Sequence, residues 1–136
     1  MANMKIDEVE GIGPSYAEKL AGAGIKNTDH LLKLCCDKKG RKNVSESTGI
    51  SEKLVLNWVN KADLMRVSGV GPQFSELLEA AGVDTVKELK HRNAENLAKK
   101  MAEVNNEKKL ARVSPDAKKV AKWVAQAKGM NAVISH

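Results

Sequence analysis

Residues 9–25 of this chain have the sequence VEGIGPSYAEKLAGAGI, and residues 67–83 have the sequence VSGVGPQFSELLEAAGV. Every aligned pair keeps the 58-residue offset that separates Gly11 from Gly69. Each copy has a glycine, an apolar residue, a second glycine and a proline, followed by a pattern with helical spacing. This arrangement predicts a tight turn that opens a short helix, and the two copies indicate a chain built from two related units.

The turn itself predicts an anion site. Glycine permits a positive φ and allows a ligand to approach the backbone, and Pro14 or Pro72 suits the first helical position, where an N–H would be unpaired. The next N–H groups then lie at the positive end of the helix dipole. Nucleic-acid phosphate is the first ligand to consider, and contacts of this kind read no bases.

Helical periodicity dominates the chain, and no stretch alternates convincingly over strand lengths. In the first copy Tyr16, Leu20 and Ala23 fall on one face of a helix expected over residues 15–23, which Gly24 ends. The corresponding residues of the second copy are Phe74, Leu77, Leu78, Ala81 and the terminating Gly82. A short helix is expected after each stop, capped by Thr28 in the first copy and Asp84 in the second.

The similarity continues beyond the turns. Ser51 is expected to cap a helix that carries Trp58, and Pro115 and Asp116 to open one that carries Trp123. These tryptophans are 65 residues apart, so the second unit holds seven additional residues. We place them between Asn93 and Arg112, where residues 105–107 (Asn-Asn-Glu) are expected to interrupt a helical stretch.

The predicted fold is therefore all-α, with two homologous multi-helix units of four or five short helices at residues 1–61 and 62–136. The large aromatics occupy equivalent positions, Tyr16 with Phe74 and Trp58 with Trp123. Base stacking would need exposed rings, whereas these lie among apolar residues, so we expect them in the core.

The net charge of +6 is uneven: residues 1–65 carry ten Lys and Arg against nine Asp and Glu, and residues 66–136 carry thirteen against eight. An excess of positive charge favours anionic partners. The basic clusters are Lys99–Lys100, Lys108–Lys109, Arg112, Lys118–Lys119 and Lys122. No apolar run approaches the ~18 residues of a membrane span, and residues 1–7 lack a signal peptide's apolar stretch, so a cytoplasmic location without a membrane partner is expected.

Nothing in the sequence assembles a catalytic set, a metal site or a cofactor site, and we expect a protein that is not an enzyme. His30, His91 and His136 have no carboxylate at a metal or triad spacing. The adjacent Cys35 and Cys36 lack zinc-site spacing and are interpreted as a half-buried pair at a helix end, with a redox-sensitive vicinal pair as the alternative. The C-terminal GMNAVISH is weakly apolar, and it could dock on the body or on a second subunit.

The two turns resemble the helix-hairpin-helix motif of DNA repair proteins, and the similarity is greatest to the repair polymerases of family X. It covers residues 6–32 and 62–90, and it implies a SAM-like or helix-hairpin-helix architecture. Residues 48–67 (TGISEKLVLNWVNKADLMRV) are typical of an uncharacterised bacterial family known as a domain of unknown function. That second resemblance spans nearly the whole chain.

The helix-hairpin-helix resemblance implies phosphate contacts from the backbone of each turn, assisted by a basic side chain. The residues that match are Gly11, Ile12, Gly13, Ser15 and Lys19 in the first turn, and Arg66, Gly69, Val70, Gly71 and Gln73 in the second. Glu10, Glu18, Glu76 and Glu79 lie near these turns and oppose an anion. Because Ser15, Lys19 and Lys26 accompany it, the first turn is expected to be the better binding site.

Two hypotheses of function remain open at this point. The first is a non-enzymatic protein that binds double-stranded or branched DNA without sequence preference. The second is a protein–protein adaptor in which both turns serve only to pack helices together.

Overall fold

The computed structural model describes residues 4–135. The described chain is all-helical, which confirms the predicted fold class, and its β pairing is limited to a single antiparallel bridge between Lys5 and Asn27. A 3-10 turn, η1 (Ile6–Glu8), precedes the helices α1 (Pro14–Gly22), α2 (Thr28–Cys35), α3 (Lys38–Thr48), α4 (Glu52–Leu64), α5 (Pro72–Ala80), α6 (Val86–Leu89), α7 (Ala94–Lys108) and α8 (Ala117–Lys128).

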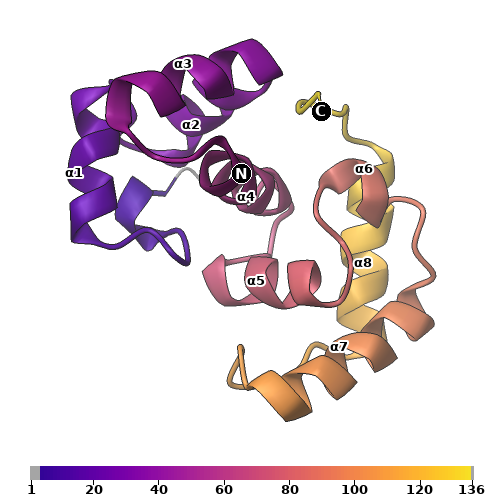
Figure 1. Ribbon diagram of the computed structural model, residues 1–136. Helices are drawn as coiled ribbons and strands as arrows, with labels where there is room; N and C mark the ends of the chain where they lie inside the picture. The colour runs from indigo at the N-terminus through magenta and orange to yellow at the C-terminus, as the bar shows by residue number, and fades with distance from the viewer. Residues whose placement is uncertain (1–3, 136) are drawn as a thin grey trace.

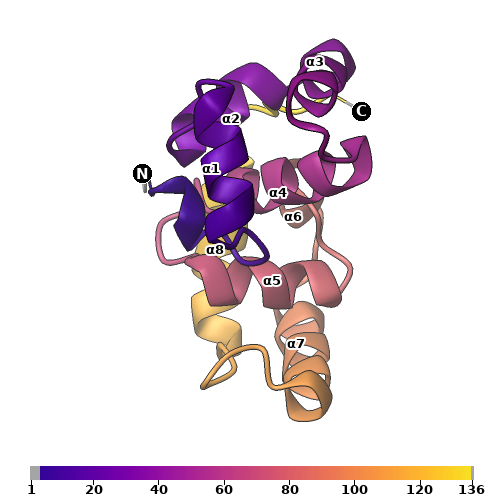
Figure 2. The ribbon, with the colours of Figure 1, turned by 60° about the vertical axis from the view of Figure 1, so that its left-hand side comes forward.

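The helices form two groups, α1–α4 and α5–α8, which meet where α4 passes into α5 (Figure 1). Each group encloses its own apolar core, and at the end of α4 Leu64 packs in the core of the second group while the next residue, Met65, packs in the core of the first. The predicted unit boundary after residue 61 therefore falls inside the last turn of a continuous helix. The view of Figure 2 shows α3 and α7 at opposite ends of the molecule.

Aromatic packing in the two cores follows one pattern, as expected from the sequence. Trp58 and Trp123 are buried, and each is covered by a half-buried ring from the helix after the turn. The ring centroids of Tyr16 and Trp58 are 5.1 Å apart at an interplanar angle of 59°, and those of Phe74 and Trp123 are 5.3 Å apart at 55°. Tilted contacts of this kind stabilise beyond the area that they bury.

Two of the four expected caps are correct. The side chains of Ser51 and Asp116 accept hydrogen bonds from the N–H groups of Leu54 (3.2 Å) and Lys119 (2.8 Å). Thr28 was predicted as a cap but is the first residue of α2, and the preceding Asn27 caps that helix instead. The hydroxyl of Thr28 is buried and accepts from the N–H of Met4, so it is committed to a tertiary contact.

Asp84 is also not a cap, because α6 begins one residue later, after Thr85. The N–H of Val86 is satisfied from outside the segment, by the Asp63 carboxylate at 2.9 Å. Asp63 is buried and also pairs with Arg66 at 2.7 Å, so one carboxylate joins the end of α4 to the start of α6. A cap supplied by another helix leaves no local sequence signal.

The predicted interruption at residues 105–107 is wrong, since α7 continues through them to Lys108. Asn105 faces the interior, where its amide accepts from the N–H of Ala111 and donates to the Ala111 carbonyl and to Ser114 Oγ. The helix ends one turn later, at Lys109, whose φ of 52° is left-handed. Asn105 therefore fixes the loop that follows α7 instead of breaking the helix.

None of the helices within residues 4–135 is long and apolar enough to cross a membrane.

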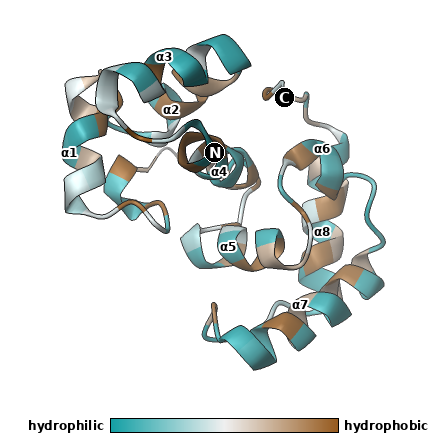
Figure 3. Cartoon of the chain, in the orientation of Figure 1, coloured by the Kyte–Doolittle hydropathy of each residue, from teal (hydrophilic) through white to brown (hydrophobic). Residues whose placement is uncertain are grey.

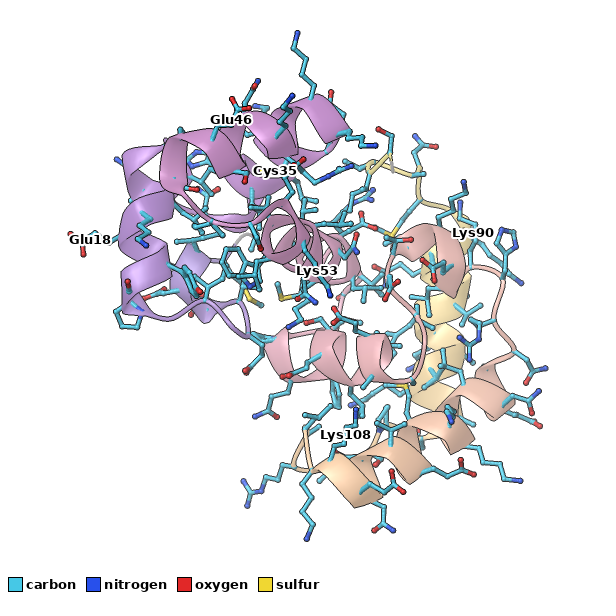
Figure 4. The ribbon with its side chains drawn as sticks, in the orientation of Figure 1. Glu18, Cys35, Glu46, Lys53, Lys90 and Lys108 are labelled. Atoms are coloured by element: carbon cyan, nitrogen blue, oxygen red, sulfur yellow. The ribbon has the colours of Figure 1, made fainter. Side chains whose placement is uncertain are left out.

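The dual role of Asp63 predicts a large cost for its removal. Asp63→Ala leaves a buried N–H at Val86 and the Arg66 guanidinium without their acceptor, so the free energy of unfolding should fall by about 2–4 kcal/mol. Urea unfolding followed by circular dichroism measures this. Glu46→Ala removes an exposed carboxylate from α3 (Figure 4) and should change stability by less than about 0.5 kcal/mol. Equal effects of the two substitutions would contradict the assignment.

Candidate nucleic-acid interface

The first glycine of each turn is required by the fold. Gly11 and Gly69 have φ values of 92° and 93°, a region that residues with a Cβ rarely adopt. A Cβ on Gly11 would lie 3.3 Å from Trp58 Nε1, and a Cβ on Gly69 would lie 3.1 Å from Trp123 Nε1. Each turn therefore lies directly on the indole of its own core.

The second glycine of each turn has no such requirement. Gly13 and Gly71 precede the helices α1 and α5 with φ values of −86° and −94°, which any residue can adopt. Apart from the adjacent residues of the chain, no atom lies within 4 Å of the position that a Cβ would take at either residue. The space above the start of both helices is open, which is the condition for a ligand to reach the backbone.

The residues between the glycines point the other way. Ile12 and Val70 are buried in the two cores, so either could contact a ligand only through its backbone. Within the described chain, no acceptor contacts the N–H groups of Gly13, Ser15 and Tyr16, or those of Gly71, Gln73 and Phe74. Both turns thus present free N–H groups at a helix start, as the sequence predicts.

Acidic side chains surround the first turn. A cavity of about 360 Å³ beside it is lined by residues 7–13, which include Asp7, Glu8 and Glu10. Lys19 lies in the last turn of α1, away from the free N–H groups, and Glu18 points outward from the same helix (Figure 4). The buried Lys61 ammonium donates to the Glu10 carbonyl at 3.2 Å and is therefore engaged within the protein.

The second turn has different neighbours on its two sides. Gln73 lines a cavity of about 670 Å³ with the loop after α7, which contributes Lys109, Arg112 and Ser114. The Lys119 ammonium lies 5.5 Å from the centroid of the Phe74 ring. On the other side, a cavity of about 740 Å³ brings Glu8 and Glu10 against Gly69 and Gly71. A basic side and an acidic side therefore meet at the start of α5.

Arg66, the basic residue expected to assist the second turn, is engaged elsewhere. Its guanidinium pairs with Asp63 at 2.7 Å and donates to the Asn131 carbonyl at 3.1 Å. The structure instead places Lys109, Arg112 and Lys119 beside this turn. The sequence identified these residues as parts of basic clusters, but only the packing of α7 and α8 brings them to Gln73 and Phe74.

Exposed lysines lie on both α7 and α8, and α7 also carries the exposed Glu95, Glu103 and Glu107; Figure 3 shows hydrophilic and hydrophobic residues alternating along α7. The lysines are Lys99, Lys100, Lys108, Lys118 and Lys122. Lys108 lies at the far end of α7 in Figure 4. The lysines that favour an anionic partner thus gather on the same group of helices as the second turn.

The two cysteines differ in their surroundings. Cys35 is fully buried at the end of α2, and burial raises the pKa of its thiol to about 11. Cys36 is half-buried, which matches the interpretation of a pair at a helix end. Because thiolate is the reactive form, Cys35 is a poor candidate for redox chemistry. Among residues 4–135 no group of three or more His, Cys, Asp and Glu side chains is placed to hold a metal ion, and His136 lies outside this range.

Comparison with known proteins identifies the family. The model of the family described as Domain of unknown function (DUF4332) matches residues 10–130, so the chain belongs to this family, as the sequence led us to expect. No curated protein and no solved structure matches the chain. The resemblance of the two turns to helix-hairpin-helix motifs stays a prediction.

The contrast between the two glycines of a turn predicts a large loss of stability on alanine substitution at the first glycine and a small one at the second. Gly11→Ala and Gly69→Ala force a Cβ into a left-handed conformation against an indole, and each should lower the free energy of unfolding by about 1–3 kcal/mol. Gly13→Ala and Gly71→Ala enter open space and should cost less than about 1 kcal/mol. Urea denaturation of the four variants measures the difference. Similar losses at both positions of a turn would show that the second glycine is also structural.

The raised pKa of Cys35 predicts a pH dependence of stability. Burial favours the neutral thiol in the folded state, so its contribution is complete below the ordinary thiol pKa of about 8.5 and is lost as the pH rises toward 11. The stability difference between the native protein and Cys35→Ala should therefore shrink from pH 8 to pH 11. Urea unfolding of both proteins at each pH tests this, and other titrating groups cancel in the comparison. A constant difference would contradict the expectation.

Proposed function

We propose that this protein binds nucleic-acid backbone, DNA foremost, without sequence preference and without catalysis, and that the second turn is its principal contact. One observation carries the proposal. Gln73, whose N–H has no acceptor, lines a cavity of about 670 Å³ together with Lys109 and Arg112. Backbone donors, a helix dipole and two cations at one place are what a phosphate group requires.

The open space at Gly71 allows a phosphate to approach the start of α5 without a steric clash. The loop that supplies the cations is held in place before any ligand arrives, because Asn105 makes three hydrogen bonds to it. A preorganised loop loses little conformational freedom on binding. Gly69, Val70, Gly71 and Gln73 contribute only through the backbone in this proposal, which is why no base sequence would be read.

The distribution of charge sets the direction of approach. Glu8 and Glu10 line the other cavity beside the second turn, so a polyanion would approach from the loop after α7 and from α8, which carries lysines and no carboxylate. The same carboxylates, with Asp7, line the first turn. The first-turn residues Gly11, Ile12, Gly13, Ser15 and Lys19 then make a secondary contact at most, and Arg66 supports the fold through Asp63.

A protein–protein adaptor is the second candidate function. The observation that favours it is the acidic lining of the first turn by Asp7, Glu8 and Glu10, which suits a basic segment of a partner protein better than a phosphate. In that case both turns would serve to pack helices, and the lysines of α7 and α8 would form an ordinary solvated surface.

Salt dependence provides the first test. Fluorescence anisotropy with labelled double-stranded, single-stranded and branched DNA of mixed sequence should show binding at 50 mM KCl. The affinity should fall steeply toward 200 mM, with a slope of roughly −0.9 per phosphate contact in a plot of log K against log salt. Absence of binding at low salt, by protein whose circular dichroism shows native helix content, would exclude the proposal and leave the adaptor.

An aspartate in place of the second glycine of a turn tests which of the two turns binds DNA. Aspartate is a favoured N-cap residue, but Glu8 and Glu10 line the same cavity as Gly71, so these opposing effects should leave the melting temperature of Gly71→Asp little changed. Its carboxylate would occupy the position proposed for the phosphate, and DNA affinity should fall by roughly tenfold or more. Gly13→Asp is the matched control at the first turn and should change the affinity by less than about twofold. The reverse result would assign the binding to the first turn.

The basic loop has its own matched pair of variants. Lys109→Glu with Arg112→Glu should weaken binding by roughly tenfold and reduce the salt slope by about one to two units. Lys39→Glu with Lys42→Glu makes the same change in net charge on α3, at the other end of the molecule (Figure 1). Only a small loss through general charge is expected there. Equal losses in the two double variants would mean that the net charge, and not this loop, determines binding.

A further inference from the structure

The chain after α8 returns to the first group of helices. Residues 130–135 leave the end of α8 and reach α3, as both views show (Figures 1 and 2). Ile134 joins the core that otherwise contains residues 6–65, and only 9% of its surface is exposed. Its neighbour Val133 is 41% exposed. One buried apolar side chain beside an exposed one is the pattern of an extended segment that docks on a surface.

Main-chain hydrogen bonds hold this segment in place. The N–H of Ser135 donates to the Cys36 carbonyl at 2.8 Å, and the Ser135 carbonyl accepts from the Arg41 guanidinium at 2.8 Å. The receiving groups lie at the junction of α2 and α3. Both of the polar contacts use backbone atoms of the docked residue, so they place no requirement on its side chain.

Arg41 makes this junction a built site. It is only 4% exposed, and it also donates to the carbonyl of Cys35, the last residue of α2, at 3.0 Å. A cation at the C-terminal end of a helix is favoured by the dipole and satisfies a carbonyl that has no helical partner. The second donor group of the same guanidinium is then aimed at the docked segment. A buried guanidinium that lost this acceptor would be left with an unpaired donor.

Side chains that follow α4 and α6 hold the start of the same segment. Lys90 Nζ donates to the Met130 carbonyl and Arg66 to the Asn131 carbonyl, each at 3.1 Å. Residues 130–131 are thus attached to α6 and to the end of α4, and residues 134–135 to the junction of α2 and α3. The segment therefore spans the two groups of helices and is hydrogen-bonded to both.

We propose that the α2–α3 junction is a binding site for an extended peptide with one apolar anchor, and that the chain's own residues 133–135 occupy it. When residues 133–135 occupy this site, the C-terminal segment links the two groups of helices. Ile134 fills the apolar position. The backbone N–H and carbonyl of Ser135 make the polar contacts, and the Arg41 guanidinium donates to that carbonyl. The site belongs to the first unit alone, because Arg41 is the fourth residue of α3 and the fourth residue of α7, its counterpart, is the buried Leu97.

The test uses the whole 136-residue chain and needs no nucleic acid, so it is independent of the proposed function. Ile134→Asp should displace the segment and lower the melting temperature by about 5 °C or more. Val133→Asp introduces the same charge one residue away, at an exposed position, and should change the melting temperature by about 1 °C or less. Equal shifts in the two variants would overturn the proposal. If Ile134→Asp does not fold, Ile134→Ala takes its place.

A synthetic peptide shows whether Ile134→Asp destabilises the protein by emptying a peptide-binding site or only by removing packing contacts. A peptide of residues 129–135 should bind folded Ile134→Asp protein saturably in isothermal titration and should restore part of the lost melting temperature. The native protein should not respond, because its own segment occupies the site. A peptide carrying Ile134→Asp should not bind, whereas one carrying Val133→Asp should. Failure of the unmodified peptide to bind or stabilise the variant would overturn the assignment, as would a dimer of the native chain formed by exchanged segments.

Discussion

The contact between a tryptophan indole and the first glycine of a turn determines how each half of the molecule is arranged. Trp58 supports Gly11 and Trp123 supports Gly69, and each indole comes from the last long helix of its own group. A side chain on either glycine would separate the turn from the core. The indole thus supports the turn from the core side. The apolar middle residue of the turn points into the core, and its second glycine lies at the surface. The free N–H groups at the helix start follow from this contact.

Sequence reasoning was reliable where a feature depends on local spacing. The helices, the turns, the Ser51 and Asp116 caps and the buried aromatics are all encoded within a few residues of one another. It was unreliable where a distant residue satisfies a local need. Asp63 supplies the acceptor expected from Asp84, and Asn105 turns inward to bind a loop where its type suggested a helix break. In both cases tertiary hydrogen bonds outweigh the local preference.

The charges of the candidate site illustrate the same limit. The two turns have almost the same backbone, with φ values at the first glycines that differ by one degree. Their surroundings come from other elements: η1 and the segment after it place carboxylates beside both turns, and the α7–α8 loop places cations beside the second alone. Counting charges near the turns along the chain favours the first one. Counting the charges that lie near each turn in the folded structure favours the second turn as the anion site.

This difference bears on why a chain would keep two turns of one shape. A turn that packs on an indole joins helices whether or not it binds a ligand, so the structural role is sufficient to retain the first glycine and the buried residue after it. It does not account for the second glycine, because Gly13 and Gly71 have ordinary φ values and empty space around them. At such N-cap positions aspartate, asparagine or serine would stabilise the helix at least as well as glycine. Under the proposal above, the open backbone at these positions serves the ligand. Beside the second turn, Lys109 and Arg112 line a cavity with Gln73, and the Lys119 ammonium lies over the Phe74 ring.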